Sequence, residues 1–333
     1  MKSSFFRRTC LVAVLFAGSQ PGQAQAPVVI KVEVENAVNY WTDVSDISKL
    51  ANVTTATTGV SRVAFETVAG IYDIVAVNGR PVKGTVAWNA RNLNLGATPA
   101  QGQSIADVTR NGLAQYFFEF LQPDGTSIGA IMVSSFNGGA APPGSPVAPG
   151  AAASQAITGG TGAFLGARGQ STQGANTVAV RQASMSEDPA NRRTNGGGKT
   201  QFILQVIPEQ RPQVVLTANG PAIVHASTNQ LVTAADPAQA GETLVLYATG
   251  LGPAKGVELG QPFPASPPAP VIAPVDVTVN GSSAFVFYAG GYPGAVDGYT
   301  VNFTLPSSVV SGMASLQLAA AWIPGTEVKL PIR

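Results

Sequence analysis

Few side chains of this sequence could support acid–base, nucleophilic or metal chemistry. Its 333 residues include one histidine, His225, and one cysteine, Cys10. A Ser–His–Asp triad needs a histidine beside a nucleophile, and most transition-metal sites need clustered His, Cys or carboxylate ligands. His225 stands alone between Val224 and Ala226, and no acidic pair has the spacing of a calcium loop. We therefore expect no catalytic residue, no metal site and no cofactor, which favours a non-catalytic protein without settling the question.

Glu119 is the carboxylate with the most unusual neighbours, because it stands in the aromatic run from Tyr116 to Phe120. If this run is a strand, Tyr116, Phe118 and Phe120 share one face and Glu119 lies on the other. We expect the aromatic face to be the core, which leaves Glu119 outside. An inward-facing Glu119 would instead lose water and become a candidate acid or base. Glu119 is thus a weak candidate for ligand binding, and chemistry through Glu119 or Asp73 is the alternative.

The segment from Thr158 to Gly166 has the glycine content of a dinucleotide-binding turn. That turn works only between a strand and a helix whose N-terminus faces the phosphates. Here the uncharged Gly/Ala/Pro/Ser stretch from Asn137 to Ala156 precedes it, and the segment from Gly169 to Asn176, which follows, cannot form a stable helix. We interpret the segment as an ordinary turn and the stretch before it as a long surface loop, whose role the sequence leaves open.

The first 26 residues have the features of a signal peptide. A basic start (Lys2, Arg7, Arg8) precedes an apolar run from Cys10 to Gly18, and a small-x-small cleavage pattern ends at Ala26. The apolar run is shorter than the roughly 20 residues that a transmembrane helix needs. We expect cleavage after Ala26 and secretion from a bacterium to the periplasm or the outside, with Cys10 removed.

The charge of the remaining chain excludes some partners. Losing three of the 19 basic residues leaves 16 against 18 acidic ones, a net charge of about −2. A nucleic-acid-binding domain would show a basic footprint, and none is present. No later segment is long and apolar enough to span a membrane as a helix. With 45% hydrophobic and 11% charged residues, the chain is also too apolar to be disordered throughout.

Residues 27–208 show the period-2 alternation of half-buried strands, as in Ile30, Val32 and Val34. Hairpin turns are expected at Asn78-Gly79 and Asp124-Gly125. Pro81 lacks a backbone donor and indicates an edge position. The other predicted elements are strands over Ile74 to Val77, Val82 to Trp88, Gln115 to Leu121, Ser127 to Val133, Val178 to Ser184 and Gln201 to Ile207, a loop over Glu187 to Lys199 and one helix over Asp43 to Val53.

The two prolines of the segment from Pro208 to Pro212 indicate a stiff joint between domains. Beyond it, about seven short strands in about 120 residues fit an Ig-like β-sandwich over residues 213–333. The clearest are Thr243 to Ala248, Val275 to Val279, Ala284 to Tyr288 after an Asn280-Gly281 turn, Tyr299 to Leu305, Ser315 to Ala321 and Glu327 to Ile332.

Three segments of the first part carry a resemblance to a known family. Residues Tyr72 to Gly79, Phe118 to Gly129 and Ile157 to Gly169 resemble parts of the dirigent and allene-oxide-cyclase-like barrels. The resemblance covers about residues 27–208 and implies an eight-stranded antiparallel β-barrel, often trimeric, in which the glycine-rich segment is a turn between strands. The catalytic motif of the cyclase has no counterpart in these segments.

The second part resembles a C-terminal domain of unknown function in secreted soil bacteria, with an Ig-like, IPT/TIG-type pattern. The matching residues are Gly241 to Pro253, Val277 to Gly281, Tyr288 to Gly290, Tyr299 to Phe303 and Leu305-Pro306. This resemblance implies an extracellular module without an activity of its own.

Together these observations predict an all-β protein, an eight-stranded antiparallel barrel followed by an Ig-like sandwich. The leading functional hypothesis is a secreted binding or structural protein, whose barrel holds an apolar small ligand or self-associates, and whose Ig-like domain contacts a surface or partner. The first alternative is an isomerase or cyclase acting on a small apolar substrate in the barrel. The second is a cell-surface adhesin.

Overall fold

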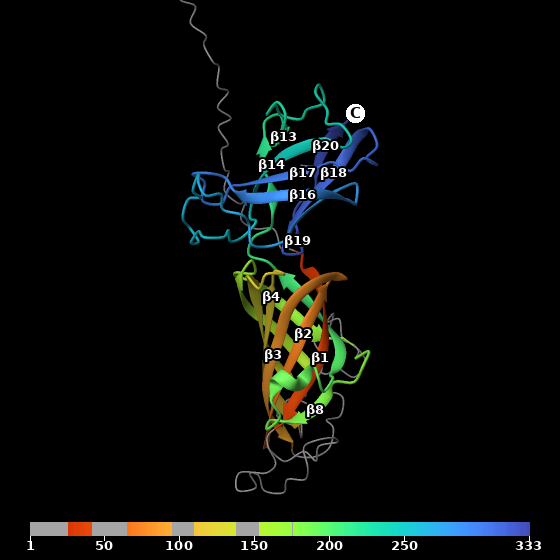
Figure 1. The fold of residues 1–333 in the computed structure, drawn as a ribbon, viewed down its shortest axis with the longest axis vertical. Coiled ribbons are helices and arrows are strands. Elements are labelled where there is room, and N and C mark those ends of the chain that lie inside the picture. The colour runs from red at the N-terminus through yellow and green to blue at the C-terminus, as the bar shows by residue number, and fades with distance from the viewer. Residues whose placement is uncertain (1–25, 42–64, 95–109, 138–152, 175) are drawn as a thin grey trace, which may run out of the picture.

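The computed structural model describes residues 26–41, 65–94, 110–137, 153–174 and 176–333. These residues form two large, mainly antiparallel sheets and a small two-stranded pair, and the two large sheets are stacked end to end along the long axis of the molecule (Figure 1). The only helix within these ranges is the short 3₁₀ helix η2 (Pro189–Arg192). The all-β prediction is therefore confirmed, while the helix predicted over residues 43–53 lies outside the described residues.

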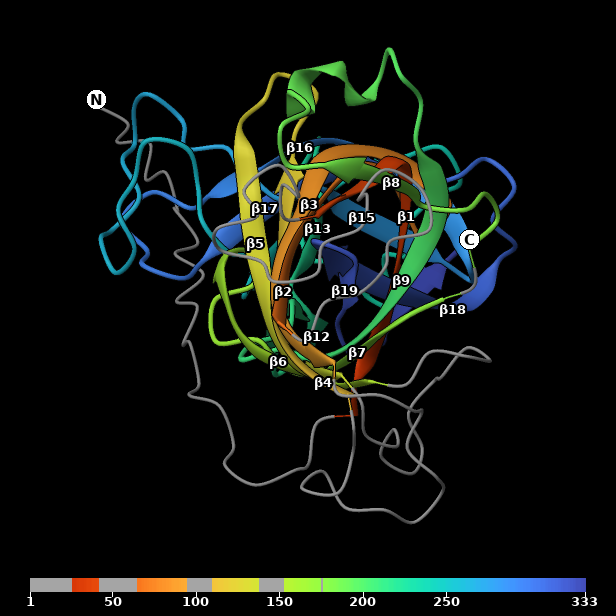
Figure 2. The ribbon, with the colours of Figure 1, turned by 90° about the horizontal axis from the view of Figure 1, so that it is seen from below.

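The first sheet closes into an eight-stranded barrel, as predicted. Around the barrel the strands follow the order β2-β3-β4-β5-β6-β7-β9-β1, every pairing is antiparallel, and β1 returns to β2 to close the ring (Figure 2). Their bounds are β1 (Val28–Trp41), β2 (Phe65–Val77), β3 (Arg80–Asn94), β4 (Arg110–Leu121), β5 (Ser127–Asn137), β6 (Ala153–Gly162), β7 (Arg168–Gln173) and β9 (Gly198–Ile207).

Side-chain alternation gives the barrel its core. In β9, Gly198, Thr200, Phe202, Leu204 and Val206 are buried in turn, while the residues between them are more exposed. The same alternation holds in β4, where the aromatic face of Tyr116, Phe118 and Phe120 is buried. The period-2 pattern therefore predicted correctly the inward face of the first half of β1, with Ile30, Val32 and Val34, and of β4.

A bulge in β1 adds a ninth strand outside the ring. Asn36 has φ = 50°, and the register shifts between Glu35 and Val38. From this point Val38 and Tyr40 pack outside the barrel core, and β8 (Arg181–Ser184) pairs in parallel with the end of β1 where β9 no longer does. The prediction of a strand from Val178 was thus too long, because only Arg181–Ser184 pairs with β1, while Val178 forms a single bridge with Lys199.

The predicted turns have the expected backbone. Asn78 and Gly79 have φ values of 50° and 77°, which a type I′ hairpin turn requires. Pro81 pairs with β2 on one side only, since the pairing of β3 with β4 begins at Lys83, so its missing donor falls at an edge as expected. The predicted 137–156 loop was too long at both ends, because β5 extends to Asn137 and β6 begins at Ala153.

The second sheet curls back on itself. Its central strand β16 pairs first with β15 and then, beyond Ala284, with β17, so the strands form two layers around a core that includes Leu244, Val277, Phe303 and Leu318. This arrangement is compatible with an Ig-like sandwich. The strands are β10 (Gln213–Val214), β13 (Ile223–His225), β14 (Thr243–Thr249), β15 (Val275–Val279), β16 (Ser282–Gly291), β17 (Tyr299–Thr304), β18 (Gly312–Ala320), β19 (Ile323–Pro324) and β20 (Val328–Ile332), and a separate pair is β11 (Leu216–Thr217) with β12 (Gly220–Pro221).

Residues 208–212 connect the two sheets, in the place where the joint was predicted. Contacts across the junction include an ion pair of 2.6 Å between Arg80 Nη1 on β3 and Asp276 Oδ1 on β15. The end of the barrel and the base of the second sheet therefore form a common surface, although independent folding of the two parts stays a prediction.

Candidate functional site at the junction of the two sheets

The two carboxylates considered for chemistry both lie on the outer wall of the barrel. The register pairs Asp73 with Thr85 and Thr85 with Glu119, so the three form one row across β2, β3 and β4. Two strand spacings separate the Cα atoms of Asp73 and Glu119 by about 10 Å. Glu119 is half-buried and points away from the aromatic core, in the orientation that the alternation predicted.

Asp73 is enclosed by basic side chains. Its carboxylate accepts hydrogen bonds from Arg193 Nε at 2.8 Å, from Asn36 Nδ2 at 2.9 Å, and from Arg192. Burial by itself would raise the pKa of Asp73, but the hydrogen bonds from Arg193, Asn36 and Arg192 lower it below its ordinary value. A carboxylate held ionised between two guanidinium groups is suited to clamping the structure and unsuited to accepting a proton.

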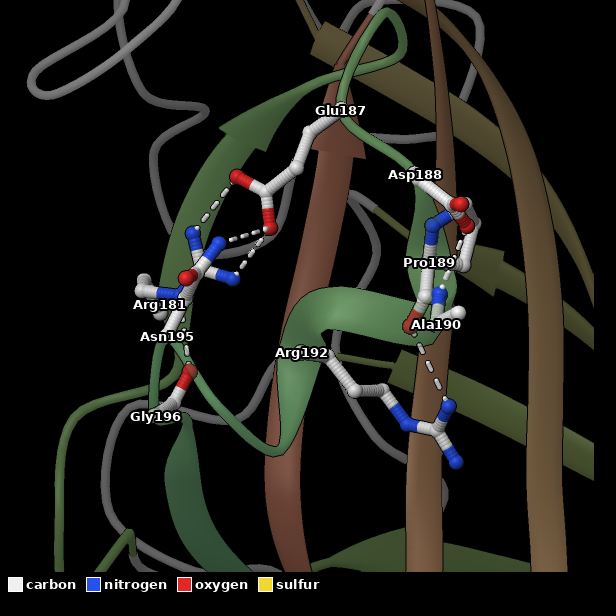
Figure 3. A network of polar contacts seen from close by, with 8 residues as sticks. All are labelled: Arg181, Glu187, Asp188, Pro189, Ala190, Arg192, Asn195 and Gly196. Carbon is white, nitrogen blue, oxygen red and sulfur yellow. Dashed lines mark hydrogen bonds and ion pairs between the residues drawn. The ribbon is translucent and has the colours of Figure 1, made fainter.

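A polar network holds the segment that carries Arg192 (Figure 3). Arg181 forms a bidentate ion pair with Glu187, with N–O distances of 2.6 and 2.9 Å, and donates to Gly196 O at 2.8 Å. Asp188 caps η2 by accepting from the backbone N–H of Ala190 at 2.8 Å. Because these contacts fix both ends of the segment, Arg192 is held against Asp73 on the outer face of the barrel.

His225 is buried between two acidic residues of the second sheet. Its Nδ1 lies 2.5 Å from Glu242 Oε1, and its Nε2 lies 3.5 Å from Asp236 Oδ2. Burial alone would lower the pKa of His225, but the hydrogen bond to Glu242 and the proximity of Asp236 raise it overall. Within the described residues, no group of three or more His, Cys, Asp or Glu side chains could hold a metal ion.

Aromatic side chains fill the middle of the barrel. Phe202 packs against Phe118 and Tyr116 with ring centroids 5.0 and 6.1 Å apart, and Trp88 stacks on Tyr116 at 5.5 Å. Trp88 Nε1 donates to the hydroxyl of Tyr72 at 2.7 Å, and that hydroxyl donates to Asn39 at 2.7 Å. These rings pack against one another inside the barrel.

One end of the barrel is covered by a tryptophan from the second sheet. Trp322 lies in the two-residue turn between β18 and β19, and its ring centroid is 5.4 Å from Phe120 and 6.3 Å from Phe164 of the barrel. Both turn residues, Ala321 and Trp322, have positive φ values, 48° and 63°. This conformation costs about 1–2 kcal/mol per non-glycine residue. Positive φ at both positions is the geometry of a two-residue hairpin turn, here formed by Ala321 and Trp322 in place of the usual asparagine and glycine.

An apolar groove of about 610 Å³ opens beside Trp322. The β2–β3 hairpin, the end of β4 and the start of β5 form one wall, and Pro274 with Trp322 forms the other. The charged residues that line the groove are Lys83 and the ion pair of Arg80 with Asp276. Its apolar lining consists of Ile74, Val75, Pro81, Val82, Leu121, Pro123, Ile128, Pro274 and Trp322.

Sequence reasoning missed this groove and its central residue. Trp322 follows three alanines near the C-terminus, and no local pattern relates it to Phe120. The signal that could have been used is weak: Trp322 is one of only three tryptophans in the chain, and it stands directly after a predicted strand. Large aromatic residues in turns are worth testing as contacts between domains.

Comparisons with known proteins add no assignment. No family model matches the sequence, and neither a curated protein nor a solved structure is similar to it. In the part of the chain that the structure describes, no helix has the length and apolar character needed to cross a membrane.

Proposed function

We propose that this protein is a secreted, non-catalytic binding protein that holds a small apolar molecule in the groove beside Trp322. The observation that carries the proposal is an apolar groove of about 610 Å³ at the meeting of two sheets. Small-molecule sites typically measure 300–1,000 Å³, are mainly apolar and are frequent between domains. The dirigent-like and Ig-like assignments, and self-association into trimers, remain part of the proposal.

The packing inside the barrel favours a ligand site at the end of the barrel over one at its centre. The rings of Tyr72, Trp88, Tyr116 and Phe202 pack against one another, and small barrels can be filled by side chains alone. Trp322, by contrast, lines a groove outside the barrel, although only 9% of its surface is exposed. A ligand in the groove would contact the accessible edge of Trp322 together with more exposed residues such as Pro81 and Pro123.

The positions of the carboxylates favour binding over an isomerase or cyclase reaction. Asp73 is engaged by Arg192, Arg193 and Asn36, and Glu119 lies on the outer wall. Neither faces the groove, whose charged lining residues are Arg80, Lys83 and Asp276. The groove thus offers apolar contacts to a ligand, and its charged lining residues can orient a polar group of that ligand.

The test uses the apolar dye N-phenyl-1-naphthylamine, whose fluorescence rises on leaving water. Val82→Asp places a charge in the groove wall, and Val29→Asp places the same charge on an exposed valine of β1 outside it. We expect Val82→Asp to weaken dye binding by tenfold or more, about 1.4 kcal/mol, and Val29→Asp to leave it unchanged. Val82→Thr, nearly isosteric, should weaken binding less. Equal affinities for all folded variants would refute the proposal.

A further inference from the structure

A second cleft, of about 290 Å³, lies at the junction in a different position. Its lining includes the β6–β7 turn of the barrel, the connection 208–212 and the loops around Gly252 and Val296. The two sides approach closely, because a β-carbon at Gly252 would lie 3.6 Å from the Cα atom of Ala163. The cleft is therefore built by both parts of the chain.

The charged residues that line this cleft are both acidic. They are Glu209, in the connection, and Asp297, before β17, and no Lys, Arg or His is among the described residues that line it. Glu209 is seated against the β6–β7 turn, since a β-carbon at Gly166 would lie 3.1 Å from its Oε2 atom. Asp297 Oδ1 accepts the N–H of Gly250 at 3.1 Å. Negative charge is thus concentrated here without a basic partner in the lining.

Asp297 is an exposed residue, so a ligand in the cleft can reach its carboxylate. Partial loss of water around the carboxylate raises the pKa of Asp297, although the N–H of Gly250 acts to lower it. The Tyr299 hydroxyl itself is directed to Gly252 O at 2.6 Å. A cation placed in the cleft would stabilise the ionised form of Asp297.

Three exposed apolar side chains line the same cleft. Leu165, Leu259 and Val296 come from three separate loops, and each has more than half of its surface exposed. Exposed apolar side chains are normally scattered, and their convergence on a concave surface is typical of a ligand site. The cleft therefore combines apolar walls with two carboxylates.

We propose that this cleft binds a small organic cation, an ammonium group carried on an apolar body. The ammonium would pair with Asp297 and Glu209, and the apolar body would pack against Leu165, Leu259 and Val296. Charge complementarity separates this site from the groove beside Trp322, whose lining includes Arg80 and Lys83. The inference does not depend on the proposed function, because the two sites use different residues.

The experiment is isothermal titration calorimetry of the full mature chain with three probes of equal length: hexylammonium, hexanol and hexanoate. We expect hexylammonium to bind at least tenfold more tightly than the other two, since only it carries a positive charge that can form an ion pair with a carboxylate. Asp297→Asn keeps an acceptor for Gly250 N–H but removes the charge, and should weaken hexylammonium binding by tenfold or more. Leu259→Ser should weaken it several-fold.

The matched control is Glu258→Gln, which removes an exposed charge next to Leu259 but outside the cleft lining. It should leave the affinity within about twofold, because exposed charges at a distance are screened. No heat with hexylammonium at about 5 mM, equal affinity for hexanol, an unchanged affinity of folded Asp297→Asn, or an equal loss in Glu258→Gln would each overturn the inference. Dye binding in the other groove should be unaffected by Asp297→Asn, which keeps the two proposals distinguishable.

Discussion

Replacing Asp73 by asparagine should strongly destabilise the barrel. The side chains of Asp73 and Arg192 are only 12% and 11% exposed, and Arg192 Nε is buried without a hydrogen-bond partner in the described structure. Asp73→Asn keeps the shape but leaves the Arg192 charge without a counter-ion. Removing one partner of a buried pair costs 3–5 kcal/mol, and because this pair retains some exposure we expect about 3 kcal/mol. For a barrel of this size, that loss lowers Tm by roughly 6–12 °C.

Two more exposed ion pairs on the same wall allow the free-energy cost of Asp73→Asn to be compared with that of breaking a solvated pair. Arg193 is 65% exposed, so Arg193→Ala should cost less than about 1 kcal/mol although it also contacts Asp73. Glu35→Gln is the matched control, because Glu35 pairs with Lys199 on the same wall and both side chains are 40–50% exposed. It makes the same chemical change as Asp73→Asn and should cost about 0–1 kcal/mol.

The assay is urea unfolding followed by tryptophan fluorescence in a Trp322→Phe background, where the remaining signal comes from Trp41 and Trp88 of the barrel. This choice matters because a chain with two parts need not unfold in one step. Since the folded pKa of Asp73 is lowered, its contribution is present above the unfolded value of about 3.9 and is lost as pH falls through the folded pKa. A cost for Asp73→Asn equal to that of Glu35→Gln would refute the reasoning.

Two further predictions concern other parts of the fold. A β-carbon at Gly70 would lie 1.8 Å from Trp88 Nε1, so Gly70→Ala should displace Trp88, cost about 1–3 kcal/mol and alter the near-UV circular dichroism spectrum. Because the folded pKa of His225 is raised, its contribution to stability is present below about pH 6.5 and is lost as pH rises through the folded pKa. Unfolding experiments between pH 5.5 and 8.5 should show this loss, and Glu242→Gln should reduce it; a pH dependence identical in Glu242→Gln would contradict the assignment.

Local signals predicted the strands and their faces well. The alternation of Tyr116, Phe118 and Phe120 with Glu119 gave the correct inward face, because successive side chains of a strand point to opposite sides whatever their partners are. Asn78-Gly79 gave the correct turn for a similar reason, since both residues tolerate positive φ. The bounds were less accurate where pairing decides them: Val178 lies outside β8, since only Arg181–Ser184 pairs with the end of β1 beyond the bulge at Asn36.

The sequence by itself determined that the chain is all-β and, in regular strands such as β4, which side is buried, because these properties depend on neighbours in the chain. Only the tertiary structure decided what the polar and aromatic residues do. Arg192 reaches Asp73 from 119 positions away, and Trp322 meets Phe120 across two sheets. Such contacts follow from strand register and from the way one sheet docks on the other, and no local periodicity encodes either. For this reason Asp73 appeared as a candidate for chemistry and proved to be clamped by arginines, while the groove beside Trp322 was not foreseen.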